Sequence, residues 1–220
     1  MAASPETLLA VFGVVPELGG VLFPPRYNVA PTDVMPVVTG RRGERMVKLL
    51  RWGLLPIWAK DPKEGAKMIN ARADGVATKP AFRVPFRTRR CLVPADGWYE
   101  WEKPSRQAWL FRRPDRGLFA FGGLWETWRG PAGPVGTFTV ITTEANTTCR
   151  FAHARMPLLL PTGAWDAWLD PDADPEILVH ILQPAPADVV VARRVGARVG
   201  NVRNDDPEVS AEEGAATLNE

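Results

Sequence analysis

The sequence predicts an α+β domain built around a curved, mostly antiparallel β-sheet. Most of its apolar residues fall in short continuous or alternating runs bounded by glycine and proline, a pattern typical of strands. Helix signals occur only near the start of the chain and in its last third. Strands and helices do not alternate regularly, which argues against a doubly wound parallel sheet. We therefore expect a single domain over residues 1–204, large enough to bury its own core.

The chain begins with a predicted short helix and continues with a series of predicted strands. Ser4 is suited to cap the helix and Pro5 to occupy its first turn, ahead of the apolar run Leu8–Phe12. The strand segments that follow are rich in β-branched, aromatic and other apolar residues. The predicted strands are Val34–Thr39, Met46–Trp52, Cys91–Val93, Gly97–Trp101, Trp109–Arg112, Leu118–Gly122 and Thr137–Thr142.

The last third of the chain carries the remaining helix signals. Thr162 and Asp174 stand at cap positions ahead of apolar runs. The predicted elements are helices over Ala164–Leu169 and Ile177–Leu182 and a closing strand over Val189–Arg193. Residues 205–220 are acidic and rich in alanine and glutamate, so we expect a flexible C-terminal tail there.

The composition excludes several classes of protein. Two cysteines and two histidines supply neither a four-ligand zinc site nor a disulfide framework, so we expect no metal, no cofactor and a reduced, cytoplasmic setting. The apolar run Leu8–Val15 follows Glu6 and has no basic residue before it, unlike a signal peptide. No apolar stretch approaches the ~20 residues that a membrane span needs.

The charges are distributed unevenly along the chain. Residues 1–116 hold 20 Lys and Arg against 11 Asp and Glu, whereas residues 117–220 hold 7 against 14. Most of the basic residues are arginines, whose planar guanidinium suits phosphates and stacks on bases. A GC-rich genome would enrich arginine together with alanine, glycine, proline and tryptophan, so this bias alone does not identify a partner.

The first candidate site segment is Met68–Arg72. If it is extended, Asn70 and Arg72 share one face while Ile69 and Ala71 pack behind them. The pair would combine an orienting amide with a clamp for phosphate or carboxylate. An ordinary polar pair on the surface of a strand is the alternative.

The second candidate segment, Pro94–Trp101, places a carboxylate among aromatic residues. Glu100 lies between Tyr99 and Trp101 in a segment otherwise apolar enough to be core. Loss of hydration would raise its pKa and suit it to act as a general acid or base near neutral pH. The alternative is a glutamate that points outward and pairs with an arginine.

The third candidate segment is Phe151–Pro157. His153 and Arg155 share a face if the chain is extended, as the proline favours. Lone histidines are more often structural than catalytic. The only other histidine, His180, lies in a predicted helix, which favours a functional reading of His153.

Other catalytic motifs fit the sequence less well. There is no Gly-x-Ser-x-Gly turn and no phosphate-binding glycine loop ahead of a helix. Cys149 stands four residues before His153, so a cysteine nucleophile is possible on paper. Cys91 opens an apolar strand and is interpreted as an inert core thiol.

Taken together, the segments resemble those of the SOS-response-associated peptidase (SRAP) family, whose members process abasic sites in DNA. The resemblance runs from about Arg26 to Asn204, and the order and spacing of the segments are specific to that family. It implies a barrel-like sheet core with flanking helices. The matching segments are Arg26–Pro31, Arg51–Trp58, Ile69–Arg72, Pro94–Trp101, His153–Pro157 and Val199–Val202.

The resemblance implies a covalent reaction with DNA. Family members bind single-stranded DNA at an abasic site, and a cysteine exposed by autoproteolytic removal of the initiator methionine attacks the deoxyribose aldehyde and forms a thiazolidine. An α-amine with pKa ~8 is far more often neutral at physiological pH than a lysine at ~10.4. In that scheme Asn70 orients the cysteine and the sugar, Glu100 moves protons during linkage and reversal, and His153 assists ring opening.

The resemblance also implies how DNA is held. Arg72 and Arg155 would bind flanking phosphates, and Trp58 and Pro31 would stack on or wedge beside neighbouring bases, with Asn28 as a further DNA contact. We expect a monomer in the cytoplasm, associated with the nucleoid when bound to DNA, with replication-fork proteins as further partners.

The sequence departs from the family pattern at its start. Family members begin Met-Cys-Gly-Arg, whereas this sequence begins Met1-Ala2-Ala3-Ser4, and we expect the true start to lie upstream. Three functions stay open. They are a repair enzyme that links covalently to DNA, a non-covalent sensor of abasic or single-stranded DNA, and a thiol peptidase.

Overall fold

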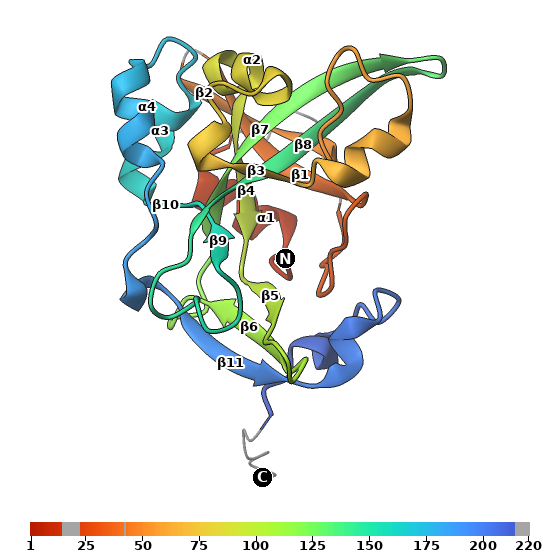
Figure 1. Ribbon diagram of the computed structural model, residues 1–220, viewed down its shortest axis with the longest axis vertical. Helices are drawn as coiled ribbons and strands as arrows, with labels where there is room; N and C mark the ends of the chain where they lie inside the picture. The colour runs from red at the N-terminus through yellow and green to blue at the C-terminus, as the bar shows by residue number, and fades with distance from the viewer. Residues whose placement is uncertain (15–22, 42, 214–220) are drawn as a thin grey trace.

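The computed structural model describes residues 1–14, 23–41 and 43–213, and its largest element is a mixed β-sheet. The strands of this sheet are β1 (Val34–Arg41), β2 (Glu44–Trp52), β3 (Asn70–Arg72), β4 (Arg90–Ala95), β7 (Phe119–Gly130), β8 (Gly133–Glu144), β9 (Arg155–Pro157) and β10 (Leu159–Leu160). Five of them close into a barrel-like ring in the order β7, β4, β1, β2, β8 and back to β7 (Figure 1). Within the ring only β2 and β8 pair in parallel. The predicted curved, mostly antiparallel sheet with a barrel-like core is confirmed.

A second, smaller sheet lies below the ring in the view of Figure 1. It contains β5 (Trp98–Trp101), β6 (Ala108–Arg112) and β11 (Val191–Val195), in the antiparallel order β11, β6, β5. One face of this sheet buries Leu110 against Val195, Val199 and Val209. The opposite face presents aromatic side chains to the main core, where the Trp98 and Phe111 rings stack at 5.2 Å. The small sheet is therefore joined to the ring through a shared aromatic core.

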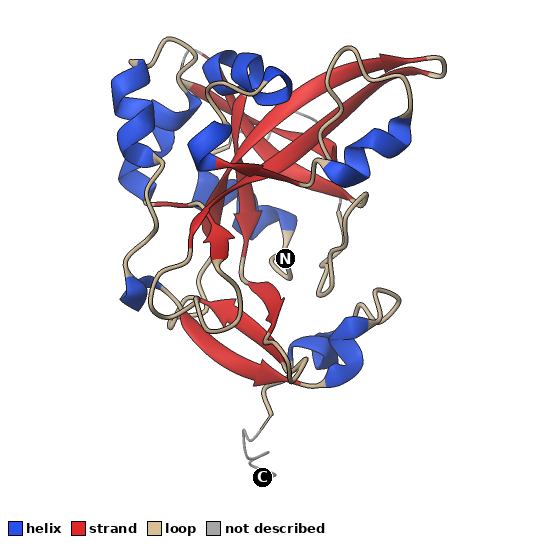
Figure 2. Cartoon of the chain, in the orientation of Figure 1, coloured by secondary structure: helices blue, strands red, loops and turns tan. Residues whose placement is uncertain are grey.

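The α-helices are α1 (Pro5–Phe12), α2 (Pro80–Thr88), α3 (Trp165–Leu169) and α4 (Pro175–Ile181). The helices α2, α3 and α4 lie at the outer edge of the strands, whereas α1 lies near the middle of the view (Figure 2). The 3₁₀ helices are η1 (Pro62–Lys67), η2 (Ala73–Gly75), η3 (Thr162–Ala164), η4 (Ala187–Val189), η5 (Ala197–Gly200) and η6 (Pro207–Ser210). As predicted, Ser4 caps α1, and its Oγ accepts a hydrogen bond from the Thr7 amide at 3.3 Å. The Phe12 ring stacks on Trp165 of α3 at 4.7 Å and so ties α1 to the later helices.

Several elements differ from the sequence prediction. The closing strand, predicted over Val189–Arg193, lies at Val191–Val195 because Ala187–Val189 form η4. The helix α2 was not predicted, and Pro85 lies inside it although proline lacks the amide that a helix interior normally uses. Phe82 and Phe86, four residues apart, are buried on one face and hold the helix in place. The hairpin of β7 and β8 is also longer than expected, because it continues to a turn at Gly133 with φ +111°.

The expectation of a flexible tail from residue 205 is wrong for residues 205–213. Val209 in η6 is buried, and Glu212 bridges to Val195 of β11. The carboxylate of Glu212 also pairs with Arg112 of β6. The rest of the expected tail, residues 214–220, lies outside the described residues.

Candidate functional site

The strand β3 presents Asn70 and Arg72 on one exposed face. Ala71 between them is completely buried. The strand runs parallel to β8, with Asn70 opposite Val140 and Arg72 opposite Thr142. Side chains of an extended strand alternate between its two faces, so the predicted shared face is confirmed.

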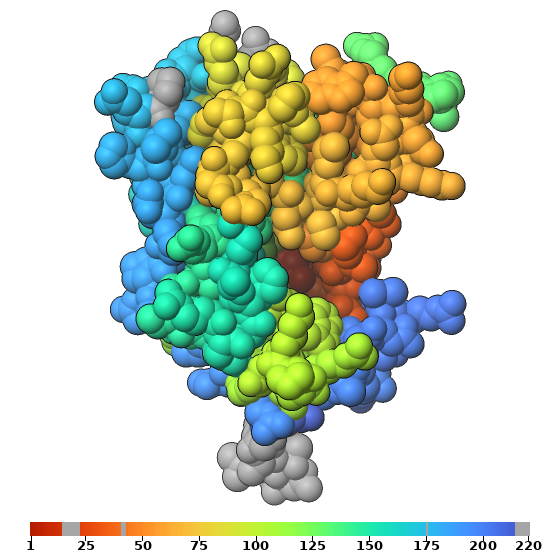
Figure 3. Space-filling view, viewed as in Figure 1, coloured from red at the N-terminus to blue at the C-terminus, as the bar shows by residue number. Residues whose placement is uncertain are grey.

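Asn70 and Arg72 line a hollow of about 460 Å³. Lys67 and Lys79 add two positive charges, and Trp58 contributes an indole that is 55% exposed. The other lining residues are Met68, Pro80, Ala81 and Phe82. Cations beside an exposed aromatic ring suit the phosphates and bases of a single strand. Figure 3 shows this face, with the orange and yellow segments that line the hollow side by side in its upper half.

The two lysines of this hollow were missed by the sequence analysis. Lys67 lies at the end of η1, three residues before Asn70, and Lys79 precedes α2, seven residues after Arg72. Their proximity in sequence to Asn70 and Arg72 was the available signal. Only the turns of η1 and η2 bring both lysines to one hollow.

Arg72 and Arg155 flank the same residue of β8. The Arg155 guanidinium donates from Nε to the Thr142 Oγ1 at 3.1 Å and from a terminal nitrogen to the Thr142 carbonyl at 2.6 Å. The Arg72 guanidinium binds both carboxylate oxygens of Asp74, at 2.6 and 3.1 Å. These hydrogen bonds, with the nearby charge of Arg155, lower the pKa of Asp74. The two arginines therefore lie together along β8, with Asp74 paired to Arg72 and Glu144 opposite Arg155.

Glu100 lies on β5, directly opposite Trp109 of β6. Its side chain is half-buried, and burial raises its pKa above the usual value, while the nearby charge of His153 acts in the opposite direction. Removing a carboxylate from water disfavours its charged form, so the predicted direction of the shift is confirmed. Glu100 and His153 are close enough to interact electrostatically although 53 residues separate them.

The ring of His153 is oriented by the backbone of its own loop. Its Nδ1 lies 3.1 Å from the Arg155 amide and 3.0 Å from the Arg155 carbonyl oxygen. The amide can only donate and the carbonyl can only accept, so Nδ1 uses one contact or the other according to the tautomer, and both hold the ring in the same orientation. The side chain is exposed, and its Nε2 makes none of these backbone contacts.

Neither cysteine is suited to act as a nucleophile. Cys91 is completely buried, and burial raises the pKa of its thiol. Cys149 is 3% exposed, and burial together with the charge of Glu100 raises its pKa to about 12. Because the thiolate is the reactive form, both thiols are inert near neutral pH.

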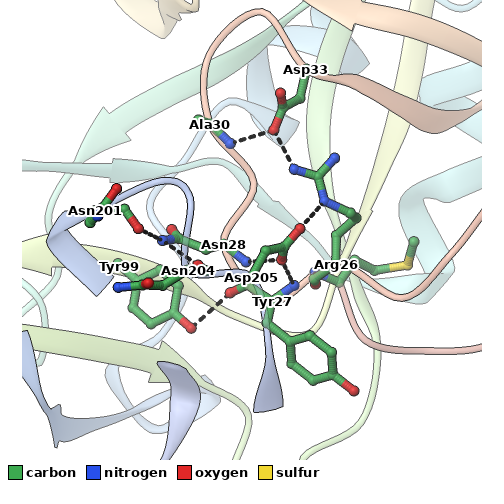
Figure 4. Close-up of polar contacts among 10 residues, drawn as sticks. Arg26, Tyr27, Asn28, Ala30, Asp33, Tyr99, Asn201, Asn204 and Asp205 are labelled. Carbon is green, nitrogen blue, oxygen red and sulfur yellow. Dashed lines mark hydrogen bonds and ion pairs between the residues drawn. The ribbon is translucent and has the colours of Figure 1, made fainter. Parts of the chain in front are cut away.

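Asn28 lies inside the protein. It is 5% exposed, and its Nδ2 donates to the carbonyls of Val199, Asn201 and Asn204 at 3.0 to 3.2 Å (Figure 4). These bonds attach the segment before β1 to the C-terminal segment. The amide of Asn28 therefore has a structural role, and the expected contact of Asn28 with DNA stays a prediction.

Asp205 reinforces the same connection. Its carboxylate accepts hydrogen bonds from the amides of Tyr27 and Asn28 and from Arg26, whose guanidinium also binds Asp33 at 2.7 Å (Figure 4). Burial alone would raise the pKa of Asp205, but these hydrogen bonds hold it below the usual value. The sequence analysis missed this carboxylate because it assigned Asp205 to the tail.

Pro31, expected to wedge beside a base, is exposed in the turn before β1. The Asp33 carboxylate accepts a hydrogen bond from the Ala30 amide at 3.0 Å across this turn. Thr32, which follows Pro31, has φ +80°, and its amide donates a hydrogen bond to the Trp52 carbonyl at 2.9 Å. The turn is thus attached to the end of β2, shortly before Trp58.

A family profile described as SOS response associated peptidase (SRAP) matches residues 1–202. The chain belongs to this family. The SRAP chain is 42% identical over 191 residues to the abasic site processing protein YoqW of Bacillus subtilis, covering 84% of this chain and 85% of YoqW. It is 32% identical over 223 residues to the abasic site processing protein HMCES of Gallus gallus, covering 84% of this chain and 65% of HMCES.

Solved structures are similar over most of the SRAP chain. A crystal structure of a protein from Bacteroides thetaiotaomicron superposes with a TM-score of 0.85 at 25% identity, covering 96% of this chain and 97% of that one. A second, from Bordetella bronchiseptica, gives a TM-score of 0.67 at 29% identity, covering 76% and 86%. Within the described part of the chain, no group of three or more residues is arranged to hold a metal ion. No helix in that part is long and apolar enough to cross a membrane.

Proposed function

We propose that this SRAP chain processes abasic sites in single-stranded DNA and does so on the face that carries Asn70, Glu100 and His153. The observation that carries the proposal is the half-buried Glu100 beside the exposed His153, on the same molecule as a cationic hollow with an exposed indole. The names of the relatives YoqW and HMCES support abasic DNA as the substrate.

The cationic region would bind the strand. Arg72 and Arg155 would bind the phosphates on either side of the missing base, with Lys67 and Lys79 adding to the positive field. Trp58 would stack on a neighbouring base, because every base offers an aromatic face to an exposed indole. Pro31 would wedge beside the strand near the end of β2.

The half-buried region would carry out the proton transfers. In this scheme His153 assists opening of the sugar ring to the free aldehyde, and Asn70 orients the aldehyde and the attacking amine. A terminal amine then adds to the aldehyde carbon, and protonated Glu100 gives its proton to the departing hydroxyl, so that water leaves and an imine forms. A raised pKa keeps Glu100 protonated at a pH where an ordinary glutamate would be ionised.

Thiazolidine formation needs a thiol on the residue that supplies the amine. Addition of that thiol to the imine carbon closes the five-membered ring. The printed sequence contains only Cys91 and Cys149, both buried. For the printed sequence we therefore propose DNA binding and at most an imine, which reverses or leads to strand cleavage by β-elimination.

A denaturing gel tests the proposal directly. The printed chain and a version extended to begin Met-Cys-Gly-Arg are incubated with a single-stranded oligonucleotide that holds one abasic site, and with the same strand lacking the site. We expect a heat-stable shifted band only from the extended version on the abasic strand. Cyanoborohydride, which reduces an imine to a stable amine, should trap the printed chain as well.

Two outcomes contradict specific parts of the proposal. A heat-stable band from the printed chain without a reductant would mean that Cys149 or another side chain reacts. If the extended version gives no shifted band, the proposed covalent reaction with DNA is wrong.

Non-covalent sensing is the second candidate function, because both described thiols are inert. It predicts binding that weakens steeply as salt is raised, since phosphate contacts release counterions. A flat salt response would count against DNA as the partner in either case.

A further inference from the structure

Phe151 is an exposed aromatic residue close in sequence to His153, and it has no role in the proposed reaction. It is 43% exposed, and its ring packs edge to face against Trp109 with the centroids 5.0 Å apart. A second contact, to Phe111, holds it at 6.0 Å. The ring is thus fixed from below by two aromatic side chains of β6 while nearly half of the residue remains open to solvent.

The loop that carries Phe151 is fixed on both sides of the ring. Cys149 and Ala152 are buried, and the Asn146 Oδ1 accepts a hydrogen bond from the Cys149 amide at 3.0 Å. The Asn146 Nδ2 in turn donates to the Ala185 carbonyl at 3.0 Å. Because the loop and the ring are held in advance, a ligand that stacks on Phe151 would lose little side-chain freedom in doing so.

The position of the ring relative to the reactive groups defines what it would bind. Trp109, beneath Phe151, lies directly opposite Glu100, and His153 follows Phe151 by two residues. On the other side, Arg155 donates a hydrogen bond to Thr142. Thr142 lies opposite Arg72, which lines the hollow. The order along this face is therefore Trp58, the arginines, the Glu100 and His153 pair, and Phe151.

We propose that Phe151 is a second stacking platform, which holds the nucleobase adjacent to the abasic sugar on the side away from Trp58. The inference rests on the proposed function. A strand that lacks one base loses a stacking interaction at the lesion, and two platforms would stack the bases on both sides of the gap. The abasic sugar would then be centred over Glu100 and His153. Trp109 acts as a positioning residue through its contact with Phe151, and its indole N–H is held by Glu102 at 3.1 Å.

Photocrosslinking with 5-iodouracil tests the assignment. Single strands with a stable abasic analogue carry 5-iodouracil immediately on one side of the analogue or on the other. After irradiation, peptide mapping should find Phe151 linked to the iodouracil from one flank and Trp58 linked to it from the other. Recovery of Trp58 from both flanks, or of neither aromatic residue from strands that bind, would overturn the second platform.

Variants of Phe151 test the stacking platform separately from the proposed binding of abasic DNA. Phe151→Ala should weaken binding of the abasic strand on the order of tenfold and abolish the link from its own flank only. Phe151→Tyr should restore both. Ile177→Ala, which removes an exposed apolar side chain from α4, is the matched control and should change neither.

The thermal midpoint of each variant shows whether it remains folded. If Phe151→Ala binds as tightly as the unchanged chain and keeps the link, the platform is wrong while abasic DNA binding stands. If the unchanged chain binds no abasic strand at all, the proposed function itself fails.

Discussion

The two halves of the candidate site differ in how much water surrounds their charged groups. On the β3 side, Arg72 and Trp58 are largely exposed, and the Arg72 side chain is 58% accessible even when paired with Asp74. On the β5 side, Glu100 is half-buried and lies near the almost fully buried Cys149. Exposed charges attract a charged strand from a distance but discriminate little, whereas a half-buried carboxylate has a shifted proton equilibrium. Under the proposed function, we therefore expect strand binding on the β3 side and proton transfer on the β5 side.

Replacing Glu100 tests the reactive side and should have the largest effect. In the extended version, Glu100→Gln should slow crosslinking by about 10² to 10⁴, the usual contribution of a positioned acid or base. Rates come from timed denaturing gels. Glu6→Gln, in the exposed first turn of α1, is the control and should leave the rate unchanged. An unaffected rate in Glu100→Gln would place proton transfer elsewhere.

Glu100→Gln should slow crosslinking but raise the stability of the folded chain, and the gain in stability should depend on pH. The pKa of Glu100 is raised in the folded chain, so its stabilising contribution is complete below the unfolded pKa of about 4.3 and is lost as the pH rises through the folded pKa. Glutamine cannot ionise. The thermal midpoint of Glu100→Gln should therefore exceed that of the unchanged chain at pH 7, and the difference should disappear near pH 4. A constant difference at all pH values would show that burial does not set this pKa.

Two asparagines extend the comparison from the site to the fold. Asn28→Ala should lower the free energy of unfolding by on the order of 3 kcal/mol, because it leaves three carbonyls without the amide that now binds them. Asn70→Ala, at an exposed position, should change stability by less than about 0.5 kcal/mol while reducing crosslinking. Urea unfolding and the gel assay give the two readouts. Equal stability losses would mean that Asn70 is also structural.

Features governed by local spacing could be predicted from the sequence. The shared face of Asn70 and Arg72 follows from the alternation of side chains in a strand. The cap at Ser4 is equally local. The direction of the Glu100 pKa shift was predicted as well, but Tyr99 and Trp101 point to the opposite face of β5, so its burial comes from other segments.

Features that depend on distant segments could not be predicted. The barrel closes through pairing such as Arg51 with Thr137, 86 residues apart in the sequence. The burial of Asn28 depends on carbonyls of residues 199–204, so its motif indicated a family but not the role of its side chain. The prediction of a flexible tail from residue 205 was wrong for residues 205–213, because composition alone does not show that Val209 packs against the small sheet.

Replacing Trp58 tests whether stacking of a base on an uncharged indole contributes to DNA binding on the β3 side. Trp58→Ala should reduce affinity for single-stranded DNA by about 1–3 kcal/mol, the usual contribution of one base–aromatic stack, and Trp58→Phe should recover most of it. Fluorescence anisotropy of a labelled strand measures both. Trp101→Ala, at an indole that is 43% exposed on β5 next to Glu100, compares the two exposed indoles and should lower affinity less than Trp58→Ala does. Equal losses in the two alanine variants would show that exposed indoles contribute without regard to position.

The arginines on either side of Thr142 should show the smallest effect, one visible mainly in its salt dependence. Arg72→Gln and Arg155→Gln should each reduce the slope of log affinity against log salt by about 0.7, the value for one phosphate contact on a single strand. Arg72 is now paired with Asp74, so binding DNA must replace that pairing, and the loss of affinity at moderate salt should be smaller for Arg72→Gln than for Arg155→Gln. Asp74→Asn should have the opposite effect and strengthen binding by releasing Arg72. If Asp74→Asn leaves the affinity unchanged at low salt, Arg72 does not contact the strand, and the positive region of the site is reduced to Arg155 and the two lysines of the hollow.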